Sequence, residues 1–173
     1  VLYDSAADHW QIYNASGARQ RVSPDSTYKI YSALFALEQG LISPQATDLN
    51  WNGQNYPFKS WNADQDLSSA LRYSVNWYFQ TLDAAGGLSA LQDFYTDIDY
   101  GNQDLSSGVS DFWMEASLKI SPLEQVELLK KMYFNEFGFK EQNVQTVKNA
   151  LLLSSDSKGS LYGKTGTGAV NGQ

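Results

Sequence analysis

The amino-acid sequence predicts an α+β fold, in which an antiparallel sheet formed by both ends of the chain lies beside a lobe of helices. Three observations predict it: strand-like runs near both ends, apolar residues at helical spacing between them, and no internal repeat. A chain of 173 residues is long enough for one sizeable core arranged in two lobes. Both ends are abrupt, so we expect residues 1–173 to be a single domain that is trimmed at both ends.

The first third of the chain is predicted to form two short strands and one buried helix. Residues 1–14 hold two short apolar runs on either side of a polar stretch, which indicates two strands, and residues 15–19 are predicted to form a turn. A helix is expected to start at Pro24 to Ser26, because apolar residues then recur at helical spacing until Gly40 supplies a stop. Its strongly apolar face predicts burial in the core.

The middle of the chain is predicted to be a long loop followed by two helices. Residues 41–66 contain several Pro, Gly and Asn residues and are expected to form the loop. Apolar residues at helical spacing predict one helix over residues 67–83 and another near residues 88–98. Residues 99–118 are expected to form a polar loop.

The last third is predicted to contain two helices and a strand. Ser121 and Glu124 form a capping box with proline at the first helical position, so a helix follows, and Glu124 is assigned to this cap. A further helix fits residues 141–153. The segment from Ser160 to Ala169 is expected to be a strand that contains several glycines.

Composition and charge argue against several classes of function. The net charge is −7 and the pI is near 4.5, with no basic cluster, so no nucleic acid partner is expected. The absence of Cys excludes disulfides and thiolate metal sites, and the single His9 cannot form a Ser-His-Asp triad alone. No metal site is expected. No signal peptide and no run of roughly 18 apolar residues is visible, so no segment here is expected to span a membrane.

Three short motifs indicate a specific chemistry. Ser26-Thr27-Tyr28-Lys29, Ser74-Val75-Asn76 and Lys164-Thr165-Gly166 match the patterns S-x-x-K, S-x-N and K-T-G. Together these patterns mark proteins that acylate an active-site serine with penicillin. Each motif alone is weak, because each arises easily by chance. Their occurrence together, in this order, with the first opening a helix and the last on an expected strand, is a strong signal.

Ser26 and Lys29 are the expected nucleophile and base. A serine hydroxyl is a weak nucleophile until a base removes its proton, and the two residues lie three apart within the first turn of the predicted helix. A lysine acts as a base only when its pKa falls, which burial and the nearby charge of Lys164 would cause. Without the other motifs, this pair would be interpreted as a helix N-cap followed by a solvated lysine.

The third motif suits recognition of an anionic substrate. Lys164 and Thr165 would bind a substrate carboxylate, and Gly166 would let the backbone approach the ligand closely. An oxyanion hole needs two donors, and the backbone N–H groups of Ser26 and Thr167 are the natural pair. The alternative interpretation of this segment is an ordinary surface strand.

The chain resembles class D β-lactamases over nearly its whole length. The resemblance rests on the first motif, the third motif, the Y-G-N element at Tyr100, Gly101 and Asn102, and the stretches Phe112-Trp113-Met114-Glu115 and Leu118-Lys119-Ile120-Ser121. It implies a serine β-lactamase and penicillin-binding transpeptidase fold. It also implies that Trp113 faces Lys29, which that family carries carboxylated on its side-chain nitrogen.

The resemblance assigns supporting roles outside the three motifs. Tyr100 and Asn102 would support the site, although a Gly-centred segment of this kind also fits a simple turn. Trp113 would otherwise be interpreted as core filler. Glu115, which could be considered as a base for deacylation, is assigned a structural role. No cofactor is expected, apart from carboxylation of Lys29 by CO₂.

One motif departs from the class D pattern. Class D enzymes generally have an apolar valine at the last position of S-x-V, where this chain has Asn76. Together with the surrounding aromatic residues, this looks closer to the extracellular penicillin-sensing domain of the β-lactam sensor-transducer receptors of Gram-positive bacteria. That resemblance implies a membrane-embedded zinc protease portion in the same receptor and a location on the extracellular face of the cell membrane.

The leading hypothesis is therefore a sensor that β-lactams acylate at Ser26. Lys29 would be the base, Ser74 would relay a proton to the leaving nitrogen, and Asn76 would prevent efficient turnover. The alternative is a secreted class D β-lactamase in which carboxylated Lys29 serves both acylation and hydrolysis. A penicillin-binding D,D-peptidase also fits S-x-N, and a non-catalytic scaffold is the remaining alternative.

Overall fold

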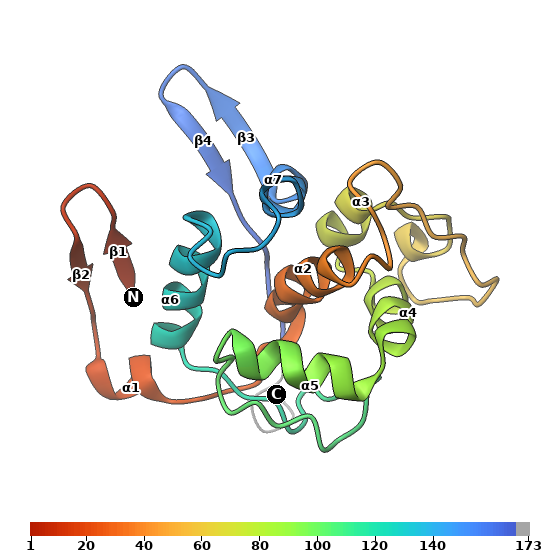
Figure 1. The fold of residues 1–173 in the computed structure, drawn as a ribbon, viewed down its shortest axis with the longest axis horizontal. Coiled ribbons are helices and arrows are strands. Elements are labelled where there is room, and N and C mark those ends of the chain that lie inside the picture. Colours follow the sequence, from red (N-terminus) through yellow and green to blue (C-terminus); the bar gives the residue numbers. More distant parts are fainter. Residues whose placement is uncertain (169–173) are drawn as a thin grey trace.

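Helices fill the centre of the structure, and two pairs of strands extend from them at the periphery (Figure 1). This computed structural model describes residues 1–168. Its mixture of helices and antiparallel strands agrees with the predicted α+β class. Within the described residues, the strands form two separate two-stranded sheets instead of the single sheet that was expected from the two ends of the chain.

The N-terminal strand pair forms as predicted. Strands β1 (Leu2–Asp4) and β2 (His9–Gln11) pair antiparallel, with Tyr3 opposite Trp10. The next segment is a short helix, α1 (Ala15–Arg19), where a turn was predicted. The helix forms because the side chain of Asn14 caps it and accepts a hydrogen bond from the backbone N–H of Gly17 at 3.1 Å.

The predicted buried helix lies at the centre of the molecule. Its first turn is a 3₁₀ segment, η1 (Asp25–Tyr28), which leads directly into α2 (Lys29–Glu38). Every residue from Lys29 to Leu37 is buried, which confirms the prediction of a core helix. The helix stops at Gly40, whose φ of 69° is the left-handed conformation that glycine adopts without a steric penalty.

The helix predicted over residues 67–83 is wrong as a single element. The structure has a 3₁₀ turn, η2 (Lys59–Trp61), in the preceding loop, and then two helices, α3 (Leu67–Arg72) and α4 (Asn76–Gly86). Ser74 lies between α3 and α4 with a φ of 52°, which no residue of a right-handed helix can adopt. The break places the hydroxyl of Ser74 in a bend and makes Asn76 the first residue of α4.

The next two helices and the loop between them agree with the predictions. Helix α5 (Leu88–Asp97) packs on α4, and α6 (Pro122–Tyr133) begins with the predicted capping box of Ser121 and Glu124. The polar loop over residues 99–118 is present, but several of its side chains enter the core. The buried members are Tyr100, Leu105, Phe112, Trp113 and Leu118.

The C-terminal elements are shorter than predicted. Helix α7 (Glu141–Ala150) ends before residue 153, because Leu152–Asp156 forms strand β3 and pairs antiparallel with β4 (Gly159–Tyr162). Residues 163–168 continue without regular structure, and Ala169, the last residue of the predicted strand, lies outside the described residues. The apolar residues at 151–153 fit helical spacing as well as they fit a strand, so their period could not separate the two structures.

An aromatic cluster packs the loop over residues 99–118 against the start of α2. The indole of Trp113 stacks on the ring of Tyr28, with centroids 5.3 Å apart and planes 6° from parallel. Tyr28 also meets the edge of Phe112 at 5.1 Å and lies 5.5 Å from Tyr95 of α5. These buried rings fix the position of Trp113 relative to the first turn of the central helix.

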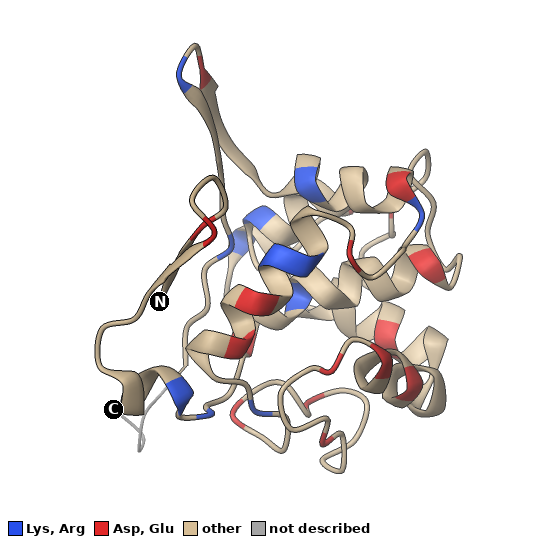
Figure 2. Cartoon of the chain, turned by 60° about the vertical axis from the view of Figure 1, so that its left-hand side comes forward, with Lys and Arg blue, Asp and Glu red and all other residues tan. Residues whose placement is uncertain are grey.

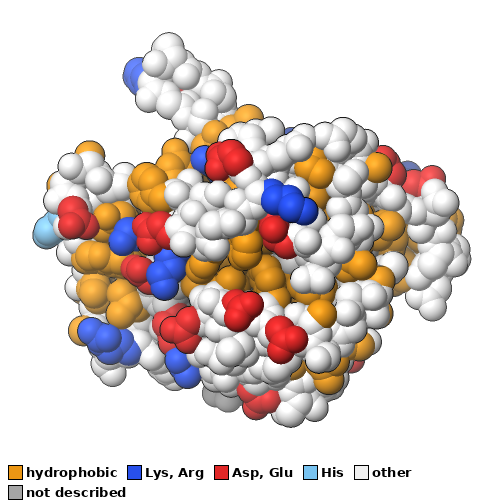
Figure 3. Space-filling view, in the orientation of Figure 1, with side chains coloured by type: hydrophobic (Ala, Val, Ile, Leu, Met, Phe, Trp, Pro, Cys, Tyr) orange, Lys and Arg blue, Asp and Glu red, His pale blue; other side chains and the backbone are white. Residues whose placement is uncertain are grey.

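In the two views of the described residues (Figure 2 and Figure 3), charges of both signs are mixed over the molecule. Figure 2 shows Asp and Glu spread over helices and loops, with Lys and Arg scattered among them. Figure 3 shows charged side chains of both signs interspersed with apolar ones on one face. Within the part of the chain that the structure describes, no helix combines the length and the apolar character needed to cross a membrane.

The fold yields a prediction at Gly101, where the loop crosses the strand-like segment before α6. Gly101 has a φ of 52°, and a Cβ there would overlap the carbonyl oxygen of Lys119. We expect Gly101→Ala to lower the free energy of unfolding by about 2–4 kcal/mol, from left-handed strain plus overpacking.

The matched control is Gly108→Ala, because Gly108 also has a positive φ, of 95°, but open space where its Cβ would lie. We expect it to cost only about 1–2 kcal/mol, from the backbone conformation alone. Urea denaturation of both variants measures the difference, and equal losses would show that the close approach to Lys119 is unimportant.

Candidate active site

The three motifs meet at one place, although they come from distant parts of the chain. Ser26 lies in η1, Lys29 begins α2, Ser74 lies in the break before α4, Asn76 begins α4, and Lys164 follows β4. The Nζ of Lys29 is 2.8 Å from the Oγ of Ser26, and the Nζ of Lys164 donates to the Oγ of Ser74. The structure therefore places two serine hydroxyls, each in contact with a lysine amine, in the same site.

The amine of Lys29 is buried among Ser26, Asn76 and Trp113. Its Nζ is 2.8 Å from both the Oγ of Ser26 and the Oδ1 of Asn76, and lies 4.2 Å from the centroid of the Trp113 ring. Burial, and after it the positive charge of Lys164, lowers the pKa of Lys29 to about 7. A substantial fraction of this amine is therefore neutral near pH 7 and able to accept a proton.

The amide of Asn76 is oriented by contacts at both of its ends. Its Oδ1 accepts a hydrogen bond from the Nζ of Lys29, and its Nδ2 donates to the Sδ of Met114 at 3.2 Å. The carbonyl end therefore faces the lysine. Because Asn76 is the first residue of α4, the break in the predicted helix is what directs this amide toward Lys29.

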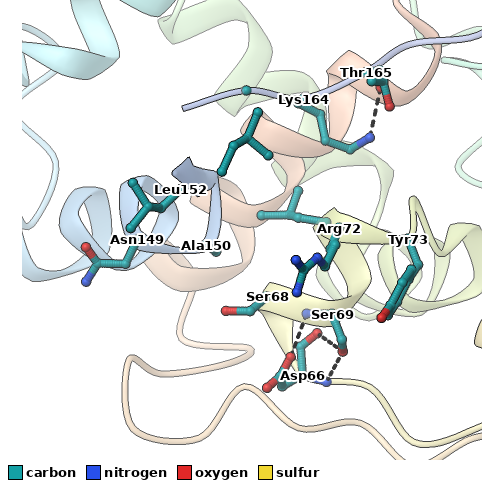
Figure 4. A pocket seen from close by; sticks show the side chains of 13 residues that line it. Asp66, Ser68, Ser69, Arg72, Tyr73, Asn149, Ala150, Leu152, Lys164 and Thr165 are labelled. Atoms are coloured by element: carbon teal, nitrogen blue, oxygen red, sulfur yellow. Dashed lines mark hydrogen bonds between the residues drawn. The ribbon is translucent and has the colours of Figure 1, made fainter. Parts of the chain in front are cut away.

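Lys164 supplies the second amine of the site. Its Nζ donates to the Oγ of Ser74 and to the carbonyl oxygen of Thr165 at 2.8 Å, and burial lowers the pKa of Lys164 to about 8. Figure 4 shows the Lys164 side chain on the wall of a larger cavity between α3, α7 and β3. That cavity has a volume of about 590 Å³ and is also lined by Arg72 and Tyr73.

A second cavity opens directly onto the nucleophile. It has a volume of about 380 Å³ and is lined by Asp25, Ser26, Asn76, Trp113, Met114, Glu115, Thr167 and Gly168. Thr167 therefore lies on the same cavity as Ser26, as an oxyanion hole formed by these two residues would require. A Cβ at Gly166 would come within 3.0 Å of the Cγ2 of Thr27, so the K-T-G segment packs closely against the S-x-x-K turn.

Tyr100 and Asn102 lie away from the reacting groups. The side chain of Asn102 accepts a hydrogen bond from the N–H of Lys119 and donates to the carbonyl of Ser117, both at 2.8 Å. Tyr100 is buried with its ring 5.1 Å from that of Tyr31. Within residues 1–168, these contacts hold the loop that carries Trp113 and do not reach Ser26.

The two glutamates considered as bases have different surroundings. Glu124 caps α6 and pairs with Arg21, which lowers the pKa of Glu124 to about 2, so it is a fixed charge. Glu115 lies on the cavity beside Ser26. A Cβ at Gly168 would overlap the carboxylates of Glu115 and Asp25, so the two acids lie close together. Burial, and after it the negative charge of Glu115, raises the pKa of Asp25.

The sequence interpretation missed a buried acid next to the site. Asp83 of α4 is buried and accepts hydrogen bonds from the Oγ of Ser32 at 2.7 Å and the hydroxyl of Tyr28 at 3.1 Å. Burial raises the pKa of Asp83 to about 7. The available signal was its spacing: Asp83 follows Asn76 by seven residues, which places both on one face of a helix.

No described group of residues offers a metal site. Within residues 1–168, His, Cys, Asp and Glu side chains do not gather in threes or more at any point that could hold an ion. His9, the single histidine, lies on the exposed strand β2.

Known proteins are similar to this chain in sequence and in structure. The family model of the penicillin binding protein transpeptidase domain matches residues 3–173. The chain is 47% identical over 173 residues to the regulatory protein BlaR1 of Bacillus licheniformis, a match that covers 100% of this chain and 29% of that protein. The chain thus spans less than a third of the length of this curated relative.

Two solved structures are similar to this chain over most of their length. The C-terminal domain of the Bacillus licheniformis BlaR penicillin-receptor has a TM-score of 0.94 and 47% identity, covering 98% of this chain and 69% of that one. The class D β-lactamase BAT-2 has a TM-score of 0.92 and 38% identity, covering 95% of this chain and 70% of that one. This chain therefore belongs to the penicillin binding protein transpeptidase domain family, in the part of it that contains penicillin-receptor domains and class D β-lactamases.

Proposed function

We propose that this chain is the β-lactam-sensing domain of a membrane receptor, in which Ser26 forms a long-lived acyl ester with the antibiotic. The observation that carries this proposal is the position of Lys29, with its buried amine 2.8 Å from both the Ser26 hydroxyl and the Asn76 amide. The first contact supports acylation and the second favours persistence of the ester. The higher identity to the receptor domain than to the class D enzyme supports the same choice.

The acylation step uses groups that already lie in contact. The Oγ of Ser26 attacks the lactam carbonyl carbon, and the neutral amine of Lys29 takes the hydroxyl proton. The C–N bond of the lactam then breaks, and the nitrogen receives a proton through the hydroxyl of Ser74, which Lys164 contacts. The product is an acyl ester on Ser26 with the ring-opened nitrogen protonated.

Substrate binding is assigned to the segment after β4. The cation of Lys164 and the hydroxyl of Thr165 would bind the β-lactam carboxylate, and Gly166 keeps this segment close to the S-x-x-K turn. The N–H groups of Ser26 and Thr167, which share one cavity, would stabilise the negative charge on the carbonyl oxygen.

A carboxylated Lys29 fits this site only in part. The Nε1 of Trp113 is buried and, within the described residues, has no hydrogen-bond partner, so it could donate to a carboxylate on the adjacent lysine nitrogen. The Oδ1 of Asn76, in contrast, is an acceptor in contact with that nitrogen and would repel such a carboxylate. We propose that carboxylation of Lys29 is therefore short-lived here.

The class D hydrolase is the second candidate function, and the unpartnered Nε1 of Trp113 is the observation that favours it. A stable carboxylate on Lys29 would supply a base for the water that hydrolyses the ester. The two functions differ in turnover. Mixing the domain with a chromogenic cephalosporin distinguishes them, because a sensor gives a burst of one equivalent and then almost no product.

The cellular context of the proposal comes from the receptor relatives. We propose that this domain stands on the extracellular face of the cell membrane and that the same receptor carries a membrane-embedded zinc protease portion. Acylation of Ser26 would be the signal that is transmitted to this protease portion. The proposal predicts that the full receptor, but not a Ser26 variant, responds to a β-lactam added outside the cell.

Ser26→Ala is expected to abolish covalent labelling by penicillin, because it removes the nucleophilic oxygen. Mass spectrometry of the wild type should show one adduct per molecule, on the peptide that contains Ser26. The control is Ser68→Ala, at an exposed position of α3, which should be labelled like the wild type. Labelling of Ser26→Ala at the wild-type level would assign the nucleophile elsewhere.

Lys29→Ala is expected to lower the acylation rate constant by about 10²–10⁴, the usual loss on removing a general base. In the wild type the rate should rise with pH and level off above about pH 7, because the amine accepts a proton only after losing its own. Stopped-flow acylation between pH 5 and 9 measures both. A loss smaller than threefold would mean that another group activates Ser26.

Asn76→Val is expected to speed deacylation, and added bicarbonate should enhance the effect, because the acceptor that opposes a carboxylate on Lys29 is removed. Each tenfold gain in rate corresponds to about 1.4 kcal/mol of barrier. Asn55→Val, at an exposed loop position, is the control and should leave the ester as stable as in the wild type. If the wild type hydrolyses many equivalents per second, the sensor proposal is wrong and the class D hydrolase is the function.

A further inference from the structure

A buried carboxyl group that the proposed reaction does not use lies directly behind the site. Asp83 is buried on α4, two helical turns after Asn76 and on the same helix face. It accepts hydrogen bonds from the Oγ of Ser32 at 2.7 Å and from the hydroxyl of Tyr28 at 3.1 Å. A carboxyl group is rarely buried in this way unless it is hydrogen-bonded or paired, because desolvation disfavours its ionised form.

Both hydrogen-bond donors of Asp83 belong to the segment that carries the base. Tyr28 immediately precedes Lys29, and Ser32 follows Lys29 by three residues, within one turn of α2. The ring of Tyr28 also stacks on Trp113, whose own ring lies 4.2 Å from the Nζ of Lys29. The acid is therefore connected to the base along the helix and through the stacked rings.

The titratable groups that act on Asp83 are Tyr28 of η1, Lys29 of α2 and Tyr95 of α5. Lys29 is in turn acted on by the charges of Lys164 and Asp25. Burial raises the pKa of both tyrosines well above the usual value, so they are neutral at pH 7. Among these neighbours, Lys29 is the group of opposite charge, and each of the two favours the ionised form of the other.

We infer that Asp83 is a positioning residue for acylation, a buried counter-charge held by Ser32 and Tyr28 that contributes to how much of Lys29 is available as a neutral base. This inference rests on the proposed function of Ser26 and Lys29. An ionised Asp83 stabilises the ammonium form of Lys29, and a protonated or neutral replacement releases the neutral amine. Because each group favours the ionised form of the other, a change in the charge of Asp83 changes the titration of Lys29.

The test is the pH profile of acylation in Asp83→Asn, which keeps the shape and removes the charge. Without the carboxylate, Lys29 loses its proton more readily, so the acid limb of the profile should move to lower pH by about half a pH unit, because Asp83 is itself partly protonated there. The ratio of the rate at pH 6 to the rate at pH 8 should then rise about two- to threefold. Asp93→Asn, the same change at an exposed position of α5, is the matched control and should leave the profile unchanged.

A second variant keeps the inference testable if Asp83→Asn does not fold. Ser32→Ala removes a hydrogen bond that favours the ionised carboxylate, so it should move the acid limb in the same direction by a smaller amount. If the acid limb of the folded variants stays within about 0.2 pH unit of the wild type, the inference is overturned. This holds also when the rate falls equally at all pH values. A wild type that β-lactams do not acylate at any pH would instead overturn the proposed function.

Discussion

The contact of one buried amine with one hydroxyl is the constraint on which the rest of this structure depends. The Nζ of Lys29 lies 2.8 Å from the Oγ of Ser26 at the start of a helix that is buried from Lys29 to Leu37. Burial of the amine lowers its pKa to about 7, so part of it is neutral near that pH. The helix fixes the spacing between the amine and the hydroxyl. Three other parts of the fold surround this pair. They are the aromatic cluster with Trp113, the start of α4 with Asn76, and the segment after β4 with Thr167.

Much of this arrangement could be predicted from the sequence. The start of the central helix, its burial and its stop at Gly40 follow from apolar spacing and terminal residues, and the cap of α6 follows from Ser121 and Glu124. The break at Ser74 could not be predicted, because apolar residues keep their helical period through it and no glycine marks the left-handed conformation. Asp83 was missed for a related reason, since it lay at the end of a helix that was drawn as one element.

The C-terminal part shows a different limit of sequence patterns. Leu151 to Leu153 are apolar in a row, and such a run satisfies a helix and a strand equally, so α7 was extended into β3. All residues of β3 and β4 are exposed, so no alternation of buried and exposed positions marked this strand pair. Local patterns therefore found the residues of the site but not the backbone paths that bring them together.

The distribution of the site along the chain determines when it can become reactive during synthesis. Ser26 and Lys29 are neighbours on one turn, but Asn76 meets Lys29 across 47 positions and Lys164 meets Ser74 across 90. A ribosome-bound chain carries the nucleophile long before it carries the cation that completes the binding site, because domains emerge from the N-terminus first. A growing chain would therefore not react with an acylating compound, and each completed molecule would fold with Ser26 still unmodified.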